Sequence, residues 1–461
     1  LKKPFVKFCI NNSLLPFIFL VYYILQIIHY QIEYEKSSST DIAIYISALL
    51  IGYSISIILS LTYFSSTNRN IFKILGITPP SDGDKPMNTL FIKQESFYKT
   101  VKSKSIWNVE LYLNTPFTVK PVHDVSHYDK EMLKSVTSRN HLNASFFELG
   151  IFSALIILGL FSDNPIFIIP ASASIILFFT IVFILTSAFY SWFKGWTTVA
   201  FVVLFLLINQ LSKSDTFTYD SMATGLNYDT EKVEYSVNKL NDIRNNIPNL
   251  INDKKNSLQI LENWKTKNAN TSKPKIVFVN TSGGGSRSML WTFYMLQSAD
   301  SLTDGKLFNQ THLITGSSGG MIGASYYREL YLQKNNLKVP ISSSYYVDNI
   351  SKDLLNPIAF SIATNDFFFR LKTYQDGKYT YTKDRGYEFE RQLLKNTESL
   401  LDKRIRDYTQ PEYNSDIPMM ILSPTVINDA RRMLISSQPI SFLTRTSTSS
   451  LVKNQPIIEN F

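Results

Sequence analysis

The stretch Thr311-His312-Leu313-Ile314-Thr315-Gly316-Ser317-Ser318-Gly319-Gly320-Met321-Ile322-Gly323-Ala324 decides the fold of the C-terminal part of this chain. Its short apolar run predicts a strand, Gly-x-Ser-x-Gly predicts a tight turn, and Met321 to Leu330 predicts a helix. This order is typical of a nucleophile elbow, in which the turn strains the backbone of Ser318 and exposes its hydroxyl. Gly316 and Gly320 lack the side chains that would collide as strand and helix close up.

A second glycine motif lies upstream and also follows a strand. Lys275 to Asn280 is a buried-type strand pattern, and it runs into Gly283-Gly284-Gly285 before a helical pattern that reaches Leu296. Two strand-helix units in succession predict a parallel sheet with right-handed crossovers. Loops at the carboxyl ends of such strands meet at one edge of the sheet, so we expect the glycine loop to face Ser318.

A glycine loop at this position is useful for acyl transfer, because negative charge develops on the carbonyl oxygen in the transition state. Unobstructed backbone N–H groups can meet that charge, and one such donor lowers the barrier by roughly 3–4 kcal/mol. Gly283, Gly284 and Gly285 are therefore candidates for an oxyanion hole. Arg287, in the first turn of the following helix, is placed to fix the loop or to attract a phosphate head group.

Other glycine-based sites fit less well. The register Gly283-x-Gly285-x-x-Ser288 lacks the third glycine of a dinucleotide fingerprint, and no Gly-Lys-Ser/Thr of a Walker loop occurs. Intramembrane serine peptidases carry their serine within an apolar span, whereas Ser318 follows a β-type strand. An ordinary loop remains the alternative for either motif taken alone.

The base that would activate Ser318 is not a histidine of the usual triad. The five histidines are at positions 29, 123, 127, 141 and 312, and none follows Ser318. An α/β-hydrolase triad runs in the order Ser, acid, His, so its base is missing here. His312 lies a full strand length from the turn and is expected to be structural. A Ser–Asp dyad remains.

Taken together, the glycine loop, the elbow and the missing histidine resemble the patatin-like phospholipase family, from about Lys273 to the end of the chain. The resemblance implies a three-layer α/β/α fold with a mostly parallel sheet, and lipid acyl hydrolase activity without a metal or other cofactor. It implies Ser318 as the nucleophile and Gly283 to Gly285 as the oxyanion loop. Ser288 stands where the family often has glycine, which departs from the pattern.

The acid of the dyad is the larger departure. The family carries it in Asp-Gly-Gly or Asp-Gly-Ala at the end of a later strand, and Asp376-Gly377 is followed instead by Lys378. Its surroundings predict a turn before a polar loop, ahead of a strand pair at Met419–Pro424 and Met433–Ser437. Asp376 is therefore a weak candidate, and Asp384 and Asp429 resemble surface turns or salt-bridged positions. We expect the acid to lie beyond Phe461.

The first 212 residues contain long apolar runs, which predict membrane-spanning helices because a span needs about 20 such residues. The runs are Phe8–Ile32, Ile42–Phe64, Phe146–Phe161, Ile166–Trp192 and Trp196–Leu211. A signal peptide is the alternative for the first run, but no small-residue cleavage site follows it. Lys and Arg positions in the short loops predict a cytoplasmic N-terminus, so five spans would place the hydrolase domain in the periplasm, outside a bacterial inner membrane.

The predicted organisation has five parts. Residues 1–64 hold two transmembrane helices, 65–145 a basic polar loop or small domain, 146–212 three more transmembrane helices, 213–272 a helical connector, and 273–461 an incomplete patatin-like α/β domain. Within the second part, His123, Asp124, His127 and Asp129 form a weak metal-ligand set, for which a solvated loop is the alternative. We expect no metal at the catalytic site. Cys9 is the only cysteine, which excludes an intramolecular disulfide.

These observations predict a membrane-bound serine hydrolase of phospholipase or lysophospholipase type. Its expected partners are a lipid substrate and the bilayer. The net charge of +9 raises the possibility of nucleic acid, but the location of the charge matters more than its total, and we expect no such partner. The loop at 65–145 carries eleven Lys and Arg against seven Asp and Glu. Two alternatives stay open: a lipid-binding scaffold or sensor without turnover, and an acyltransferase on the same fold.

Overall fold

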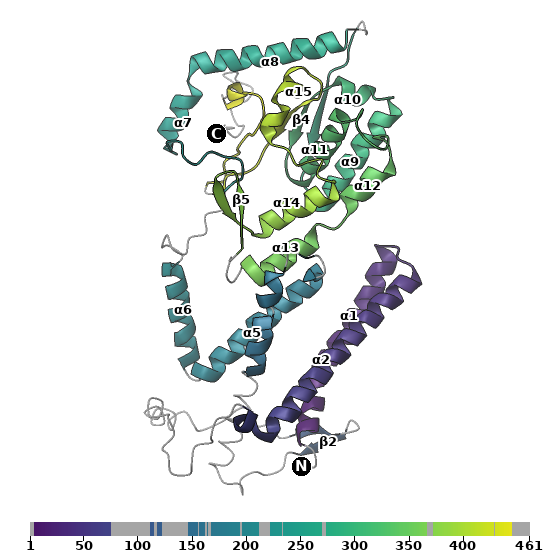
Figure 1. Cartoon of the computed structure of the whole chain (residues 1–461), viewed down its shortest axis with the longest axis vertical. Helices are drawn as coiled ribbons and strands as arrows, with labels where there is room; N and C mark the ends of the chain where they lie inside the picture. The colour runs from purple at the N-terminus through teal and green to yellow at the C-terminus, as the bar shows by residue number, and fades with distance from the viewer. Residues whose placement is uncertain are drawn as a thin grey trace. The chain divides into compact units, whose positions relative to one another are not determined.

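The structure is a computed structural model of the chain (Figure 1). It describes residues 4–74, 111–114, 118–121 and 146–444, apart from gaps at 155, 162–163, 165–166, 194–195, 212–221, 233, 270–272, 367–371 and 428. The chain forms two compact units, Leu1–Ile151 and Phe152–Phe461, which are described separately.

The first unit is dominated by two apolar helices, α1 (Pro4–Glu33) and α2 (Ser39–Ile74). Each contains a segment long and apolar enough to cross a membrane, Ser13–Glu33 and Ser39–Tyr63. A short antiparallel pair, β1 (Leu111–Asn114) and β2 (Thr118–Pro121), also belongs to this unit. The first two predicted runs therefore form helices of membrane-spanning length. Most of the predicted 65–145 domain lies outside the described residues.

Apolar helices also form at the other three predicted runs. They are the helical residues between 146 and 160, α5 (Ala171–Phe193) and α6 (Thr197–Leu211), and their apolar segments are shorter than those of α1 and α2. That these helices cross a membrane stays a prediction.

The predicted helical connector contains α7 (Val237–Arg244) and α8 (Ile247–Lys267). The Ser236 hydroxyl caps α7 by accepting from the Lys239 N–H, and the Asn246 side chain caps α8. Pro248 lies in the first turn of α8, where its missing N–H has no helical partner to lose. The helix α7 ends at Arg244, and α8 begins at Ile247, directly before this proline.

The core of the second unit is a parallel sheet of three strands in the order β3-β4-β7. The strands are β3 (Val277–Thr281), β4 (Thr311–Gly316) and β7 (Met419–Leu422). Helices α9 (Gly285–Leu302) and α10 (Lys306–Gln310) connect β3 to β4, which gives the predicted crossover. The register pairs Thr281 with Gly316 and Gly316 with Leu422, so all three strands end at one edge.

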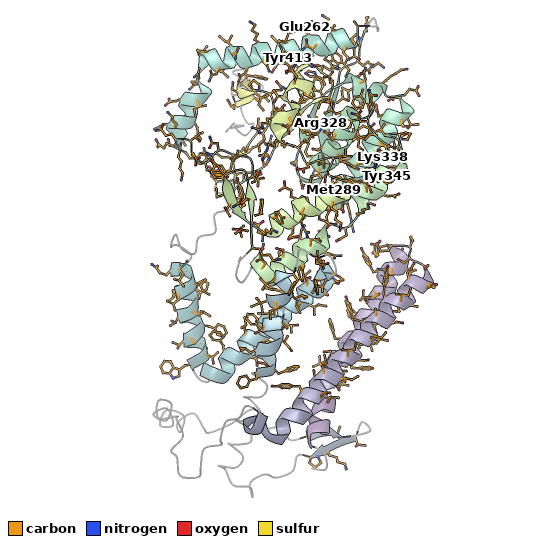
Figure 2. All side chains as sticks on the ribbon, viewed as in Figure 1. Glu262, Met289, Arg328, Lys338, Tyr345 and Tyr413 are labelled. Atoms are coloured by element: carbon orange, nitrogen blue, oxygen red, sulfur yellow. The ribbon has the colours of Figure 1, made fainter. Side chains whose placement is uncertain are left out.

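Helices cover both faces of this sheet. Side chains alternate along β7: Met420 packs into the cluster with α9 and α11 (Ser318–Leu332), whereas Met419 and Ile421 pack with Ile260 of α8. Phe293 of α9 stacks on Tyr326 of α11 with ring centroids 5.1 Å apart. Figure 2 shows the side chains of this packed region. The second unit is thus a mainly helical domain built on a small parallel sheet.

The chain between β4 and β7 adds the elements that surround the sheet edge. They are α12 (Ser344–Ser351), α13 (Leu355–Ser361), a π-helical turn η4 (Ile362–Asp366), β5 (Thr373–Asp376), β6 (Tyr379–Thr382), α14 (Arg385–Asn396), the 3₁₀ turn η5 (Ile405–Tyr408) and α15 (Thr409–Tyr413). A last 3₁₀ turn, η6 (Ser441–Thr444), follows β7.

Two local predictions are wrong. The first is the polar loop predicted after Asp376-Gly377. Its residues Tyr379–Tyr381 lie instead in a strand that pairs antiparallel with β5, and Gly377, with a left-handed φ of 62°, lies in the turn of this hairpin. Met433–Ser437 does not form a sheet strand: Ile435 makes only an isolated antiparallel bridge to Leu422. That segment turns back along β7 after Pro424 instead of entering the parallel sheet.

Candidate active site

Ser318 occupies the turn between β4 and α11 in a strained conformation. Its φ is 58°, while Ser317 before it is extended at −150° and Gly316 has φ of 149°. A non-glycine residue persists in this region only where its surroundings hold it, and such residues cluster at functional sites. Ser318 is exposed, and its hydroxyl has no hydrogen-bond partner within the described residues.

The glycine loop lies directly against this turn, which confirms the predicted juxtaposition. A methyl group placed on Gly283 would lie 3.3 Å from Cβ and 3.6 Å from Oγ of Ser318. A methyl group on Gly319 would lie 2.0 Å from the carbonyl oxygen of Gly285. The two motifs thus touch through backbone atoms, and no side chain separates the loop from the serine. The role of the loop amides as an oxyanion hole stays a prediction.

Gly316 and Gly320 sit where the expected close approach occurs. A methyl group on Gly316 would lie 2.2 Å from the Thr281 carbonyl oxygen, and one on Gly320 would lie 2.5 Å from that of Ser282. Real Cβ atoms do not approach backbone so closely, so both positions require glycine.

Arg287 and Ser288, in the first turn of α9 after the glycine loop, have different environments. The Ser288 hydroxyl donates to the Ser282 carbonyl oxygen at 2.7 Å and so closes the loop on itself. The residue that departs from the family pattern therefore has a structural function. Arg287 is exposed, and its guanidinium has no ion-pair or hydrogen-bond partner in the described part of the chain.

Ser318 opens into a cleft of about 970 Å³. Backbone of Gly285, Gly316 and Gly319 borders it beside the serine. Most of the remaining wall is apolar and comes from α13, α14 and the segments around β7; it includes Leu354, Leu355, Phe389, Leu393, Leu401 and Ile435. The cleft is thus mainly apolar, with the serine and the glycine backbone on one side.

Glu390 of α14 is the carboxylate among the described residues that line this cleft. Burial raises the pKa of Glu390, and the charges of Asp402 and Asp376 raise it further. Sequence reasoning missed this residue because it missed α14. The signal was present: Asp384 caps the helix by accepting from the Gly386 and Tyr387 N–H groups, and Phe389 and Leu393 have helical spacing.

Asp376, the weak sequence candidate for the acid, lies elsewhere. It ends β5 and accepts from Arg404 Nη2 at 2.7 Å. It lines a neighbouring cavity of about 880 Å³ and is not among the residues that line the Ser318 cleft. Asp429, by contrast, is salt-bridged as expected, with Arg431 at 3.0 Å. The acid expected past Phe461 lies outside the described residues.

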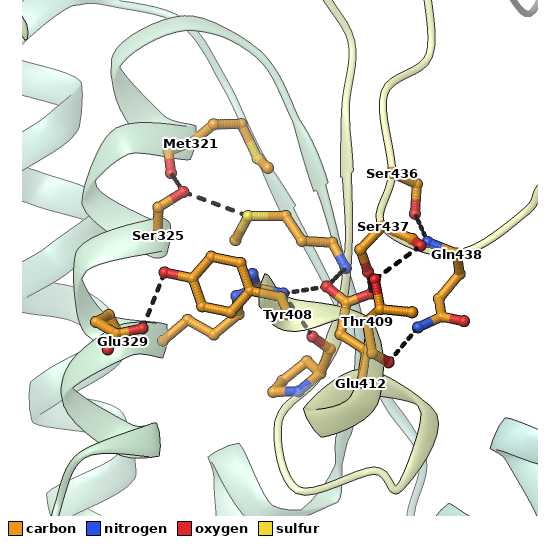
Figure 3. A network of polar contacts seen from close by, with 12 residues as sticks. Met321, Ser325, Glu329, Tyr408, Thr409, Glu412, Ser436, Ser437 and Gln438 are labelled. Carbon is orange, nitrogen blue, oxygen red and sulfur yellow. Dashed lines mark hydrogen bonds and ion pairs between the residues drawn. The ribbon is translucent and has the colours of Figure 1, made fainter. Parts of the chain in front are cut away.

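A buried polar network holds α11 behind the elbow (Figure 3). Tyr408 donates its hydroxyl to Glu329 at 2.8 Å, and Lys403 forms an ion pair with the same carboxylate. Glu412 of α15 pairs with Arg328 and accepts from Ser437 and from the Met420 N–H of β7. The network thereby links the helix that begins at Ser318 to the last strand. Burial raises the pKa of Glu412, while Arg328 opposes that shift.

His312 behaves as a structural residue, as predicted. It lies at the start of β4, with ring centroids 6.3 Å from Trp264 and 6.1 Å from Phe278, and burial lowers its pKa. The possible ligands His123, Asp124, His127 and Asp129 lie outside the described residues. Within the described part of the chain, no group of three or more His, Cys, Asp or Glu side chains is placed to hold a metal ion.

Comparisons of this chain with models of protein families, with curated proteins and with solved structures found no match.

Proposed function

We propose that this chain is a membrane-bound serine lipid acyl hydrolase of phospholipase or lysophospholipase type, with a patatin-like domain over residues 273–461. The observation that carries the proposal is the contact between the Gly283 loop and Ser318, which has a left-handed φ of 58°. Strain at an exposed serine, with an unobstructed backbone loop beside it, is the arrangement that acyl transfer requires.

In the proposed reaction, Ser318 Oγ attacks the ester carbonyl carbon while its proton passes to a carboxylate base. Backbone N–H groups of the glycine loop hold the oxyanion of the tetrahedral intermediate. The carbon–oxygen bond to the alcohol then breaks, and the base returns the proton to that leaving oxygen. Water repeats the sequence on the acyl-enzyme and releases a fatty acid. The Asp of the dyad remains an expectation from the family resemblance.

A lipid substrate is supported by the cleft and by the apolar helices. An acyl chain fits the apolar wall formed by Phe389, Leu393 and Leu401. Two helices of spanning length precede the domain, and three further apolar runs complete the proposed multi-pass anchor. With the N-terminus in the cytoplasm, five spans put the hydrolase domain on the periplasmic side of a bacterial inner membrane. An anchored enzyme would meet its insoluble substrate at the bilayer surface.

The proposal is tested by labelling the full chain in detergent with a fluorophosphonate probe, which reacts with activated serines. We expect the wild type to be labelled and Ser318→Ala to be unlabelled. Fatty-acid release from phospholipid vesicles should follow the same pattern. A wild-type chain that binds vesicles but shows no Ser318-dependent labelling would overturn the hydrolase proposal.

One observation favours a second candidate, a lipid-binding scaffold or sensor. The Ser318 hydroxyl has no base bonded to it among the described residues, and activation of a serine requires one. The labelling experiment separates the two candidates, since a scaffold would bind lipid in the same cleft without reacting with the probe.

A further inference from the structure

Helix α13 lies between α14, which lines the Ser318 cleft, and the apolar helix α5 (Figure 1). It packs against α5 on one side and against α14 on the other. The Asn356 side chain of α13 accepts from the Ala171 N–H at 2.7 Å, so α13 caps the first turn of α5. Pro357 and Phe360 of α13 are buried.

The π-helical turn that continues α13 strengthens this contact. Ala363 and Thr364 are buried, and η4 also packs on α5. A methyl group on Gly159 would lie 2.7 Å from Thr364 Cβ and 3.1 Å from its backbone oxygen. Two apolar segments, one around Gly159 and one formed by α5, therefore close on the same element. π-Helical turns of this kind are frequent at functional sites.

The same element reaches the cleft. Leu354, just before α13, is 3 % exposed, and Leu355, its first residue, is 58 % exposed; both line the Ser318 cleft. Phe389 and Leu393 of α14 continue this wall. An apolar surface thus extends from the lip of the cleft at Leu355 inward toward the serine.

The outward face of α5 has the properties of a lipid-facing surface. No residue of its 23 is charged, and Ile175, Phe179 and Phe183 are exposed. The hydroxyls of Thr180 and Thr186 each donate at 2.8 Å to a backbone carbonyl four residues earlier, so the helix satisfies these polar groups by itself. Internal satisfaction of polar groups is what hydrocarbon demands of a segment within it. Lipid acyl chains, rather than a protein partner, are therefore the occupant that this face fits.

We propose that α13 and η4 form a docking element that holds the mouth of the Ser318 cleft at the bilayer surface. The substrate would be a long-chain lipid taken directly from the leaflet, with its acyl chain entering over Leu355, rather than a lipid monomer captured from water. This inference rests on the proposed hydrolase function, because it assigns the source of that enzyme's substrate.

The test compares two identical substitutions in one apolar helical segment. Gly159→Val places a side chain against Thr364, whereas Gly150→Val is the matched control, because nothing lies within 4 Å of a methyl group at Gly150. Full-length variants are reconstituted in vesicles of phosphatidylethanolamine and phosphatidylglycerol. Two activities are measured: fatty-acid release from the vesicle lipid, and hydrolysis of soluble p-nitrophenyl butyrate. Fluorophosphonate labelling of Ser318 checks that the site is intact.

We expect Gly159→Val to lower release from vesicle lipid by about tenfold while soluble-ester hydrolysis and labelling stay within about twofold of wild type. Gly150→Val should change neither activity. Asn356→Ala, which removes only the cap on α5, should show the same selective loss more weakly. An equal loss of both activities in Gly159→Val, or a loss of neither, would overturn the docking role. If the wild type hydrolyses neither substrate, the proposed function itself fails, and that result is distinct.

Discussion

Arg328 of α11 and Glu412 of α15 form an ion pair in which only 5 % and 1 % of the two side chains are exposed. The guanidinium also donates to the Pro418 carbonyl oxygen and lies over the ring of Tyr408. Glu412 in turn accepts from the Met420 N–H. The pair therefore fixes the elbow helix relative to the start of β7.

The first prediction concerns this pair. Glu412→Gln should lower the free energy of unfolding by about 3–5 kcal/mol, because the substitution leaves a buried guanidinium without its counter-charge. The double variant Arg328→Met with Glu412→Gln should cost less than Glu412→Gln alone, since the stranded charge is gone. Urea unfolding of the detergent-solubilised chain measures both.

The control is the exposed pair of Lys265 and Glu262, whose side chains are 68 % and 64 % exposed. Glu262→Gln should change the free energy of unfolding by less than about 1 kcal/mol. Equal decreases in the free energy of unfolding for Glu262→Gln and Glu412→Gln would show that the buried pair does not stabilise the domain.

The second prediction separates two glycines of the site by their surroundings. Gly283→Ala adds a methyl group 3.3 Å from Ser318 Cβ and 3.6 Å from its Oγ, so the fold should tolerate it with a shift of a few tenths of an ångström while approach of the ester carbonyl is obstructed. We expect Ser318 labelling to fall at least about tenfold, with little change in thermal unfolding.

Gly319→Ala should behave oppositely, because its methyl group meets the Gly285 carbonyl oxygen at 2.0 Å and the backbone must move. Its melting temperature should fall clearly below that of wild type. If Gly283→Ala is labelled like wild type, the loop does not border the reacting atoms.

The third prediction is a pH dependence that originates at His312. Burial lowers the pKa of His312, so the folded state binds a proton less readily than the unfolded state. Stability is therefore greatest above the pKa of His312 in the unfolded state, about 6.5. It is lost as the pH falls through the lower pKa of His312 in the folded state. The melting temperature should therefore decrease as the pH falls.

His312→Phe keeps an aromatic ring between Trp264 and Phe278 and cannot titrate. From about pH 7.5 to about pH 5 its melting temperature should fall less than that of wild type. Identical slopes for the two proteins would contradict the assignment to His312.

The fourth prediction uses the single cysteine to test topology. In a Cys9→Ser background, Glu35→Cys lies in the exposed turn between α1 and α2, and Lys306→Cys lies on the exposed surface of the α/β domain. With five spans and a cytoplasmic N-terminus, a membrane-impermeant maleimide should label both from the periplasmic side. Labelling of Lys306→Cys only after lysis would reverse the proposed side of the domain.

The sequence was most informative where local chemistry alone determines the backbone. Gly316 and Gly320 predicted the close approach of strand and helix. The turn at Ser318 was predicted from the same motif, residues 316–320. These predictions needed no knowledge of distant contacts.

The remainder of the cleft depends on packing between distant segments. The cleft is also lined by Glu390, Lys403 and Tyr408, which come from α14, from η5 and from the loop between them. These segments pack against the cleft only once the sheet has formed. The hairpin of β5 and β6 was missed because Tyr379 to Tyr381 contains no aliphatic residue; in the structure the Tyr381 ring stacks on Tyr374 of the other strand. Tyr and Thr are both enriched in strands, so the β-signal was present in this segment.

The position of β4 between β3 and β7 has a dynamic consequence for the serine. Both neighbours must separate before the backbone N–H groups of β4 meet water, whereas β3 and β7 each have one strand partner within the described residues. In a hydrogen–deuterium exchange experiment, the amides of Ile314 and Thr315 should therefore exchange only through the largest openings of the domain. A local opening of the helices around the cleft would therefore leave β4 formed, and Ser318 would keep its strained conformation during it.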